Sequence, residues 1–124
     1  MKPRWAFVTL AIATASATCA WAGEAGVVDA KVRRSASNTF DFDVTVKSVD
    51  KGAGYYADAI EVLAPDGKLL GRRELLHSHE DEQPFTRDLY RVRVPPSIEV
   101  VVVRAHHNVK GYDGTTLTLK LPTR

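Results

Sequence analysis

Residues 23–124 of this 124-residue chain contain no cysteine, methionine or tryptophan, because Cys19, Met1, Trp5 and Trp21 all fall in the first 22 positions. Without a thiol, this part of the chain can form no disulfide, no cysteine nucleophile and no thiolate metal site. Without methionine, a copper(I) carrier or a blue-copper centre is not expected. Any metal would therefore be held by nitrogen and oxygen ligands.

An excess of one charge is also lacking once the first 22 residues are set aside. Those residues include Lys2 and Arg4 but no acid, and the two account for the whole excess of 17 basic over 15 acidic residues. Binding to nucleic acid or to an anionic lipid surface depends on many uncompensated Lys and Arg side chains. The neutral balance of 23–124 argues against both, and no nucleic-acid partner is expected.

The first 22 residues have the layout of a secretory signal peptide. Lys2 and Arg4 precede the apolar run 5–17, and small residues follow up to Ala22. The run is shorter than the roughly 20 residues that a membrane-spanning helix needs, so no membrane span is expected. The sequence predicts cleavage after Ala22 and a periplasmic or secreted product.

Cys19 offers an alternative, a lipid anchor. The three residues before it are Ser16, Ala17 and Thr18, which lack the leading Leu that usually opens such a site. Simple cleavage after Ala22 is therefore the favoured interpretation.

Hydrophobic and polar residues alternate with a period of two through most of 23–124. The clearest example is the segment in which Phe40, Phe42, Val44 and Val46 alternate with Asp, Thr and Lys. Such alternation is typical of a β-strand with one buried and one wet face. No window of a dozen residues in this part of the chain carries a capped helical stripe, so the sequence predicts an all-β chain.

Turn residues divide this part of the chain into seven strands. The sequence Pro65-Asp66-Gly67 is a turn signal, and Pro95 and Pro96 end a strand because proline cannot donate to the ladder. Seven short strands in about 100 residues predict a single domain, 23–124, with a seven-stranded antiparallel sandwich of the immunoglobulin or fibronectin-III-like type. The predicted strands lie near 26–33, 39–48, 56–63, 68–77, 86–94, 98–106 and 115–121, with the sixth placed centrally in its sheet.

Histidine is the one residue type that clusters in a way that suggests chemistry. His77 and His79 lie two positions apart, so they share a face if the strand continues that far. His106 and His107 are adjacent and point to opposite faces, so only one of them, taken as His106, can join the first pair.

The predicted topology brings both histidine pairs to the same end of the same sheet. The hairpin places His77 beside Tyr55. The third and sixth strands are antiparallel neighbours in a sandwich of this type, so His106 also ends close to Tyr55. The loops that cover this end would add Asp50, Tyr112 and Asp113.

This convergence predicts a site for a divalent transition metal, zinc or copper(II), on the exposed side of the sheet. Binding should weaken below about pH 6, because a protonated imidazole cannot ligate. The alternative, in which the histidines are structural or solvated, stays open, since His-x-His is a short pattern. The candidate ligands are His77, His79, His106, Asp81 and Glu82.

Ion pairs are expected around the bend that enters the fifth strand. Arg87 could hold Glu82 or Asp58 in a two-pronged pair. Asp58 has the parity of the inward-facing residues of its strand, and a buried carboxylate needs a partner, for which Arg87 and Arg104 are the candidates. These four residues are predicted to be structural.

Catalysis finds little support in the sequence. Ser78 lies between two histidines but has no Gly-x-Ser-x-Gly elbow around it. The carboxylates of Asp81 and Glu82 are neighbours in one loop and do not face each other across a cleft. The chain is therefore not expected to be an enzyme.

Several stretches of the sequence together form a recognisable pattern: Tyr56-Ala-Asp58, 61–67, Leu76-His-Ser-His79, Asp81-Glu-Gln-Pro-Phe-Thr-Arg87, and Arg104-Ala-His106 through Gly111-Tyr112. In these stretches the chain resembles a family of small exported bacterial proteins with no established activity. The resemblance implies an exported β-sandwich and supplies no chemistry. The family pattern has Pro where Ser78 stands and a further His where Lys110 stands, so one potential ligand is missing here.

Two functions remain open from the sequence. The first is a small non-enzymatic binding domain that holds zinc or copper(II). The second is an accessory module that docks another envelope protein through a sheet face or an edge strand, with the histidines in structural roles.

Overall fold

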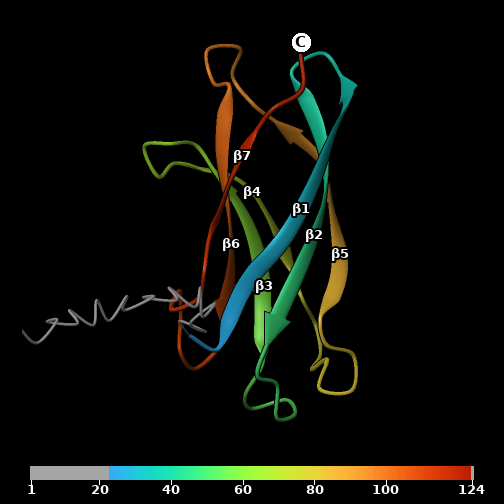
Figure 1. Cartoon of the computed structure of the whole chain (residues 1–124), viewed down its shortest axis with the longest axis vertical. Coiled ribbons are helices and arrows are strands. Elements are labelled where there is room, and N and C mark those ends of the chain that lie inside the picture. Colours follow the sequence, from blue (N-terminus) through green and yellow to red (C-terminus); the bar gives the residue numbers. More distant parts are fainter. Residues whose placement is uncertain (1–22, 124) are drawn as a thin grey trace, which may run out of the picture.

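Two antiparallel β-sheets face each other in a computed structural model, which describes residues 23–123 (Figure 1). One sheet has three strands in the order β1-β2-β5, and the other has four in the order β4-β3-β6-β7. The predicted signal peptide, its cleavage site and Cys19 lie outside the described residues. The strands are β1 (Ala25–Ala36), β2 (Thr39–Ser48), β3 (Ala57–Leu63), β4 (Leu69–Glu74), β5 (Phe85–Arg93), β6 (Val100–His107) and β7 (Leu117–Lys120).

The all-β prediction with seven antiparallel strands is confirmed, and most strand ends fall within two or three residues of those expected. The fourth strand is the main exception, since β4 ends at Glu74 and not at 77. His77 and His79 therefore lie in the connection 75–84. β3 and β6 are antiparallel neighbours, and β6 lies between β3 and β7, both as predicted.

Aliphatic and phenylalanine side chains fill the space between the sheets. Phe40, Phe42 and Phe85 are its largest members, and all three are almost completely buried. Alternate residues of β2 and β6 point into this layer, in agreement with the period of two in their sequences. Each large side chain buried in this way contributes about 1.5–3 kcal/mol to folding, so the core needs neither tryptophan nor a disulfide.

A β-bulge interrupts the pairing of β3 with β6. Ala57 pairs with His107 and Ala59 pairs with His106, so Asp58 is an extra residue on β3. A bulge of this kind re-aims the side chain of the inserted residue. Asp58 was expected to point inward, and that prediction is wrong: its carboxylate contacts His106 on the outer face of the sheet.

The start of β1 packs tightly against the segment that leads into β7. The N–H of Val27 donates to the carbonyl oxygen of Thr115 at 2.9 Å. At Gly114 the backbones come closer still, because a Cβ atom there would lie 1.7 Å from the carbonyl oxygen of Ala25. Only glycine fits at such a contact.

Candidate functional site

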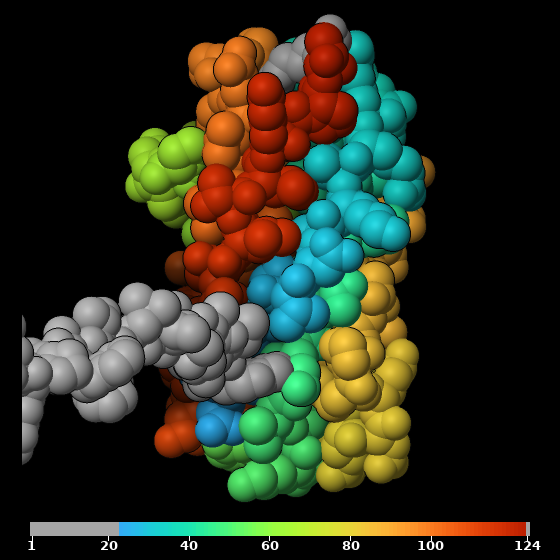
Figure 2. All heavy atoms as spheres, in the orientation of Figure 1, coloured from blue at the N-terminus to red at the C-terminus, as the bar shows by residue number. Residues whose placement is uncertain are grey.

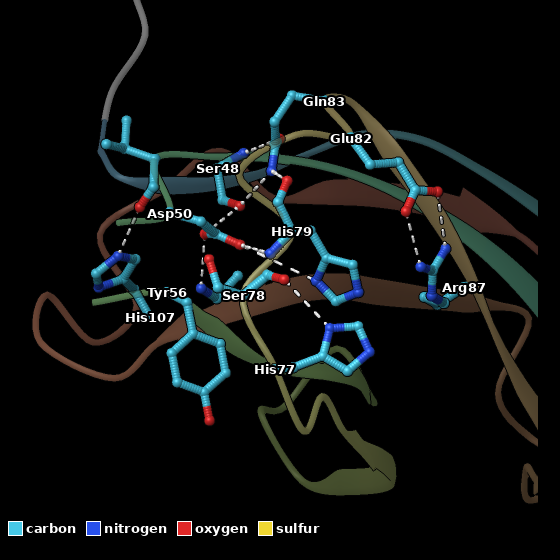
Figure 3. A network of polar contacts seen from close by, with 12 residues as sticks. Ser48, Asp50, Tyr56, His77, Ser78, His79, Glu82, Gln83, Arg87 and His107 are labelled. Carbon is cyan, nitrogen blue, oxygen red and sulfur yellow. Dashed lines mark hydrogen bonds and ion pairs between the residues drawn. The ribbon is translucent and has the colours of Figure 1, made fainter. Parts of the chain in front are cut away.

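Three connections meet at one end of the sandwich, and the buried carboxylate of Asp50 joins two of them. Its Oδ1 accepts hydrogen bonds from the hydroxyl of Ser48 at 2.7 Å and from the N–H of Ala57 at 3.0 Å. Its Oδ2 accepts the N–H of His79 at 2.8 Å. Figure 3 shows Asp50 between the two segments. The carboxylate side chain is fully buried, so it satisfies backbone donors that water cannot reach.

His107 fixes the third connection to this end. Its Nδ1 accepts the N–H groups of Val109 and Lys110, both at 3.2 Å, and its Nε2 lies 3.0 Å from the carbonyl oxygen of Val49. The ring therefore carries its proton on Nε2, which donates to Val49. Both ring nitrogens are occupied, so His107 shapes the loop and is not available as a metal ligand.

His79 lies on the inner side of the sandwich. Its ring stacks on Phe85 with a centroid distance of 4.2 Å, and only 3% of its side chain is exposed. Its Nδ1 is buried without a hydrogen-bond partner and lies 4.0 Å from Oδ2 of Asp50. Burial, together with the positive charge of Arg87, lowers the pKa of His79 below its ordinary value, although Asp50 opposes this shift.

The buried His79 ring predicts a loss of stability on mild acidification. A group whose pKa is lowered by folding takes up its proton more readily in the unfolded chain. Its stabilising effect is therefore fully present above the ordinary pKa of about 6.5 and is lost as the pH falls through the folded-state pKa. The free energy of unfolding, measured by urea titration, should fall as the pH is lowered from about 7.5 to about 5.

His79→Phe should remove this pH dependence, because phenylalanine can keep the stacking on Phe85 and cannot be protonated. His77→Phe is the matched control and should retain the wild-type fall, since His77 is exposed. A fall of the same size in His79→Phe would show that another group causes it.

His77 lies next to His79 but faces solvent. The two ring centroids are 4.5 Å apart, and Nδ1 of His77 is 3.2 Å from the carbonyl oxygen of Ser78. Figure 3 shows the ring of His77 beside that of His79. The hydroxyl of Ser78 accepts the N–H of Gly52 at 3.3 Å.

The outer face of the four-stranded sheet holds His106, away from His79. Nδ1 of His106 contacts Oδ1 of Asp58, and its ring packs edge-on against Tyr112 with a centroid distance of 4.7 Å. His106 therefore follows the exposed side of β6, as its parity predicted. The expected three-histidine cluster is divided, because His79 turns inward and His106 turns outward.

No group of three or more His, Cys, Asp or Glu residues within 23–123 is arranged to hold a metal ion. The segments that carry His77, His79 and His106 meet at one end of the sandwich, as predicted. Their side chains do not form a common group of three ligands within residues 23–123. Metal binding by the remaining pair, His77 and His79, stays a prediction.

Glu61 is the centre of a charged network that the sequence did not reveal. Its carboxylate is 3% exposed and accepts hydrogen bonds from Nε of Arg104 at 2.8 Å, from the hydroxyl of Tyr112 at 3.0 Å, and from Arg72. Burial alone would raise the pKa of Glu61, but these hydrogen bonds outweigh it and lower the pKa. The candidate partner of Arg104 was Asp58, whereas the structure pairs Arg104 with Glu61 and Asp58 with His106.

The predicted pair between Glu82 and Arg87 is present in the structure. The two guanidinium nitrogens of Arg87 donate to the two oxygens of Glu82 at 3.4 and 3.1 Å. Arg87 lowers the pKa of Glu82 through these bonds. Asp81 is exposed beside them. Glu82 is thus occupied by an ion pair, and Asp81 is the freer of the two candidate carboxylate ligands.

Comparison with known proteins gives one informative similarity. The chain is 40% identical over 96 residues to a protein of Halomicrobium mukohataei that is named "Putative lipoprotein". The aligned part is 77% of this chain and 47% of the relative, so it spans about half of the relative's length. No protein-family model matches the chain, and no solved structure matches it. Within the described residues, no helix is long and apolar enough to cross a membrane.

Proposed function

We propose that this chain is an exported, non-enzymatic sandwich of the immunoglobulin or fibronectin-III-like type that docks another envelope protein through the outer face of β4-β3-β6-β7. Export is supported by the signal-like residues 1–22 and by the printed name of the relative, which contains the word lipoprotein. A role without catalysis is supported by Ser78, the serine that lies between the two histidines. Its hydroxyl accepts a hydrogen bond from the backbone N–H of Gly52.

The arrangement of Tyr112 and Arg104 carries the proposal. Tyr112 is 48% exposed and lies over the sheet with the Arg104 guanidinium 3.7 Å from its ring centroid. Tyrosine and arginine are the residues most enriched among those that dominate binding energy at protein interfaces. An aromatic ring with a guanidinium stacked on it offers apolar contact and hydrogen-bond donors side by side.

Glu61 makes this surface rigid before a partner arrives. It holds Arg72, Arg104 and Tyr112 at once from a buried position, so their side chains are already ordered. Ordering a long side chain on binding costs about 0.5–1.5 kcal/mol, and a preformed arrangement avoids that cost. The outer face is thus suited to recognise a partner surface that presents carboxylates or carbonyl groups to the two arginines.

Tyr112→Ala should reduce capture of the partner from an envelope extract by at least about tenfold, as expected for an interfacial tyrosine. The chain offers a matched control in Tyr90→Ala. Tyr90 is 46% exposed on β5 of the opposite sheet and also has an arginine, Arg33, over its ring at 4.9 Å. The control should bind like wild type. Equal losses in both variants, or capture that neither substitution changes, would contradict docking through this face.

A second candidate, weak binding of zinc or copper(II), is favoured by the pair of adjacent imidazoles and the unpartnered Nδ1 of His79. His77 and His79 would supply two ligands, and the exposed carboxylate of Asp81 is the remaining candidate from the predicted set. Calorimetric titration of either metal should show binding that His77→Ala/His79→Ala abolishes and that His106→Ala leaves unchanged. Absence of binding tighter than about 10 μM would leave only the docking function.

A further inference from the structure

The connections at one end of the sandwich each expose a large aliphatic side chain. Val49 follows β2 and is 40% exposed, Leu76 follows β4 and is 84% exposed, and Val109 follows β6 and is 56% exposed. We call these three residues the apolar tips. A leucine exposed to this degree gains little free energy from folding, because most of its apolar surface stays in water, and it would gain more if a partner surface covered it.

Hydrogen bonds join the three connections into one continuous surface. Tyr56 and Asn108 exchange two of them, one at 2.9 Å and one at 3.0 Å, which ties 49–56 to 107–114. Gly52 donates to Ser78 at 3.3 Å, which ties 49–56 to 75–84. Figure 2 shows these segments together at the lower end of the molecule. The apolar tips therefore belong to one end of the sandwich and are not scattered over its surface.

The described part of the chain also begins at this end. The N–H of Glu24 donates to the Asp113 side chain at 3.1 Å, and the Glu24 carbonyl accepts the N–H of Val49 at 2.7 Å. Cys19 precedes Gly23 by four residues, a span of at most about 14 Å when fully extended. If the alternative to cleavage after Ala22 holds, a lipid attached to Cys19 would hold this end close to a bilayer.

We propose that the apolar tips insert into the surface of a lipid bilayer, so that the end of the sandwich formed by the loops 49–56, 75–84 and 107–114 faces the membrane. This contact uses other side chains than the proposed protein-docking face and does not depend on it, although Tyr112 of that face also lies on the loop 107–114. Leu76, Val49 and Val109 are of the size and chemistry that enter the headgroup and acyl boundary to about 5–10 Å.

The neighbouring side chains fit a contact that is apolar and not electrostatic. Tyr55 and Tyr56 are half-buried on the same loops, and aromatic rings with a polar end are typical of the membrane interface. Lys51 and Lys110 are offset by exposed acids of the same end, Glu80 and Asp81 among them. The tips should therefore bind bilayers with little dependence on salt. A few aliphatic side chains alone give marginal, reversible attachment, which becomes stable when a second anchor is present.

Tryptophan fluorescence tests this orientation directly, because residues 23–124 contain no tryptophan. The full chain, expressed with its own N-terminus and purified as the cell processes it, would carry Leu76→Trp. Vesicles of phosphatidylethanolamine and phosphatidylglycerol with brominated acyl chains should quench this fluorescence at least about twofold, because a tip at the acyl boundary lies within reach of the bromines. Wild type measures any background from Trp5 and Trp21.

Leu69→Trp is the matched control, since Leu69 is 48% exposed at the other end of β4. It should not be quenched. In a second measurement, made with Cys19→Ser so that no lipid at this position can hold the protein, Leu76→Ser/Val109→Ser should weaken sedimentation with vesicles at least about tenfold, whereas Leu69→Ser should not.

Equal quenching at positions 69 and 76, or none at 76, would overturn the proposal. So would a Trp at 76 that is already shielded without vesicles and unchanged by them, because the tips would then be covered by protein. Unchanged sedimentation of the double variant would overturn it as well.

Discussion

Asp50→Ala is expected to lower the free energy of unfolding by about 4 kcal/mol, which corresponds to roughly 20 °C in Tm for a domain of this size. The substitution leaves the N–H groups of Ala57 and His79 buried without an acceptor. Each such group costs about 1–3 kcal/mol. The hydroxyl of Ser48 can rotate, and it keeps a hydrogen bond from Gln83, so it adds less.

Urea unfolding monitored by circular dichroism measures this loss. Asp50→Asn should lose only about 1–2 kcal/mol, because the amide oxygen can still accept from Ser48 and Ala57 while the acceptor for His79 is replaced. Asp81→Ala is the exposed control and should stay within about 0.5 kcal/mol of wild type. A loss below about 1 kcal/mol in Asp50→Ala would mean that the loops find other acceptors.

Gly114→Ala should destabilise the fold by about 3 kcal/mol, the upper part of the range for overpacking. A Cβ atom at this position would meet the carbonyl oxygen of Ala25 at 1.7 Å and its carbonyl carbon at 2.3 Å. Both are backbone atoms of β1, which cannot rotate out of the way as a side chain can. The start of β1 must therefore separate from the segment before β7.

The matched control is Gly54→Ala, because a Cβ atom there would meet nothing within 4 Å. This variant should have the stability of wild type within about 1 kcal/mol. Thermal unfolding of the two variants side by side gives the comparison. Equal midpoints would show that β1 and the segment before β7 tolerate separation.

The strand positions were predictable because buried and exposed residues alternate along a half-buried strand, and this alternation appears in the sequence as a period of two. In β2 the buried residues Phe40, Phe42, Val44 and Val46 are the ones that the alternation marked. The pairing of β3 with β6 followed from the sandwich topology, and with it the meeting of distant segments at one end. Short-range pattern and general topology were sufficient for these features.

The site was less predictable because it depends on features that alternation does not encode. A single inserted residue, Asp58, reverses the face of its own side chain relative to its neighbours. β4 ends three residues early, so His79 follows the connection inward and stacks on Phe85. The spacing correctly predicted that the side chains of His77 and His79 lie close together. It could not predict where these side chains point.

The burial and the partners of polar residues were also not predictable from the sequence. The alternation predicts an exposed Glu61. In the structure its carboxylate is buried and is held by two arginines and by Tyr112, which lies 51 residues away. His107 was set aside as a metal ligand, and its structural role was not predicted: its ring caps the turn that follows it. Glu61 and the Nε2 of His107 have partners that only the tertiary fold brings close, so no local pattern in the sequence predicts these contacts.

The two ends of the described chain lie at opposite ends of the long axis (Figure 1). β1 starts at the loop end beside Asp113 and Val49, and the last residues after β7 lie at the other end beside Glu99. Hydrogen bonds between antiparallel strands run perpendicular to the strands. Tension applied between the ends would therefore load the bonds between β1 and β2 in shear, many at once, and would not unzip them singly. Such a geometry resists mechanical extension.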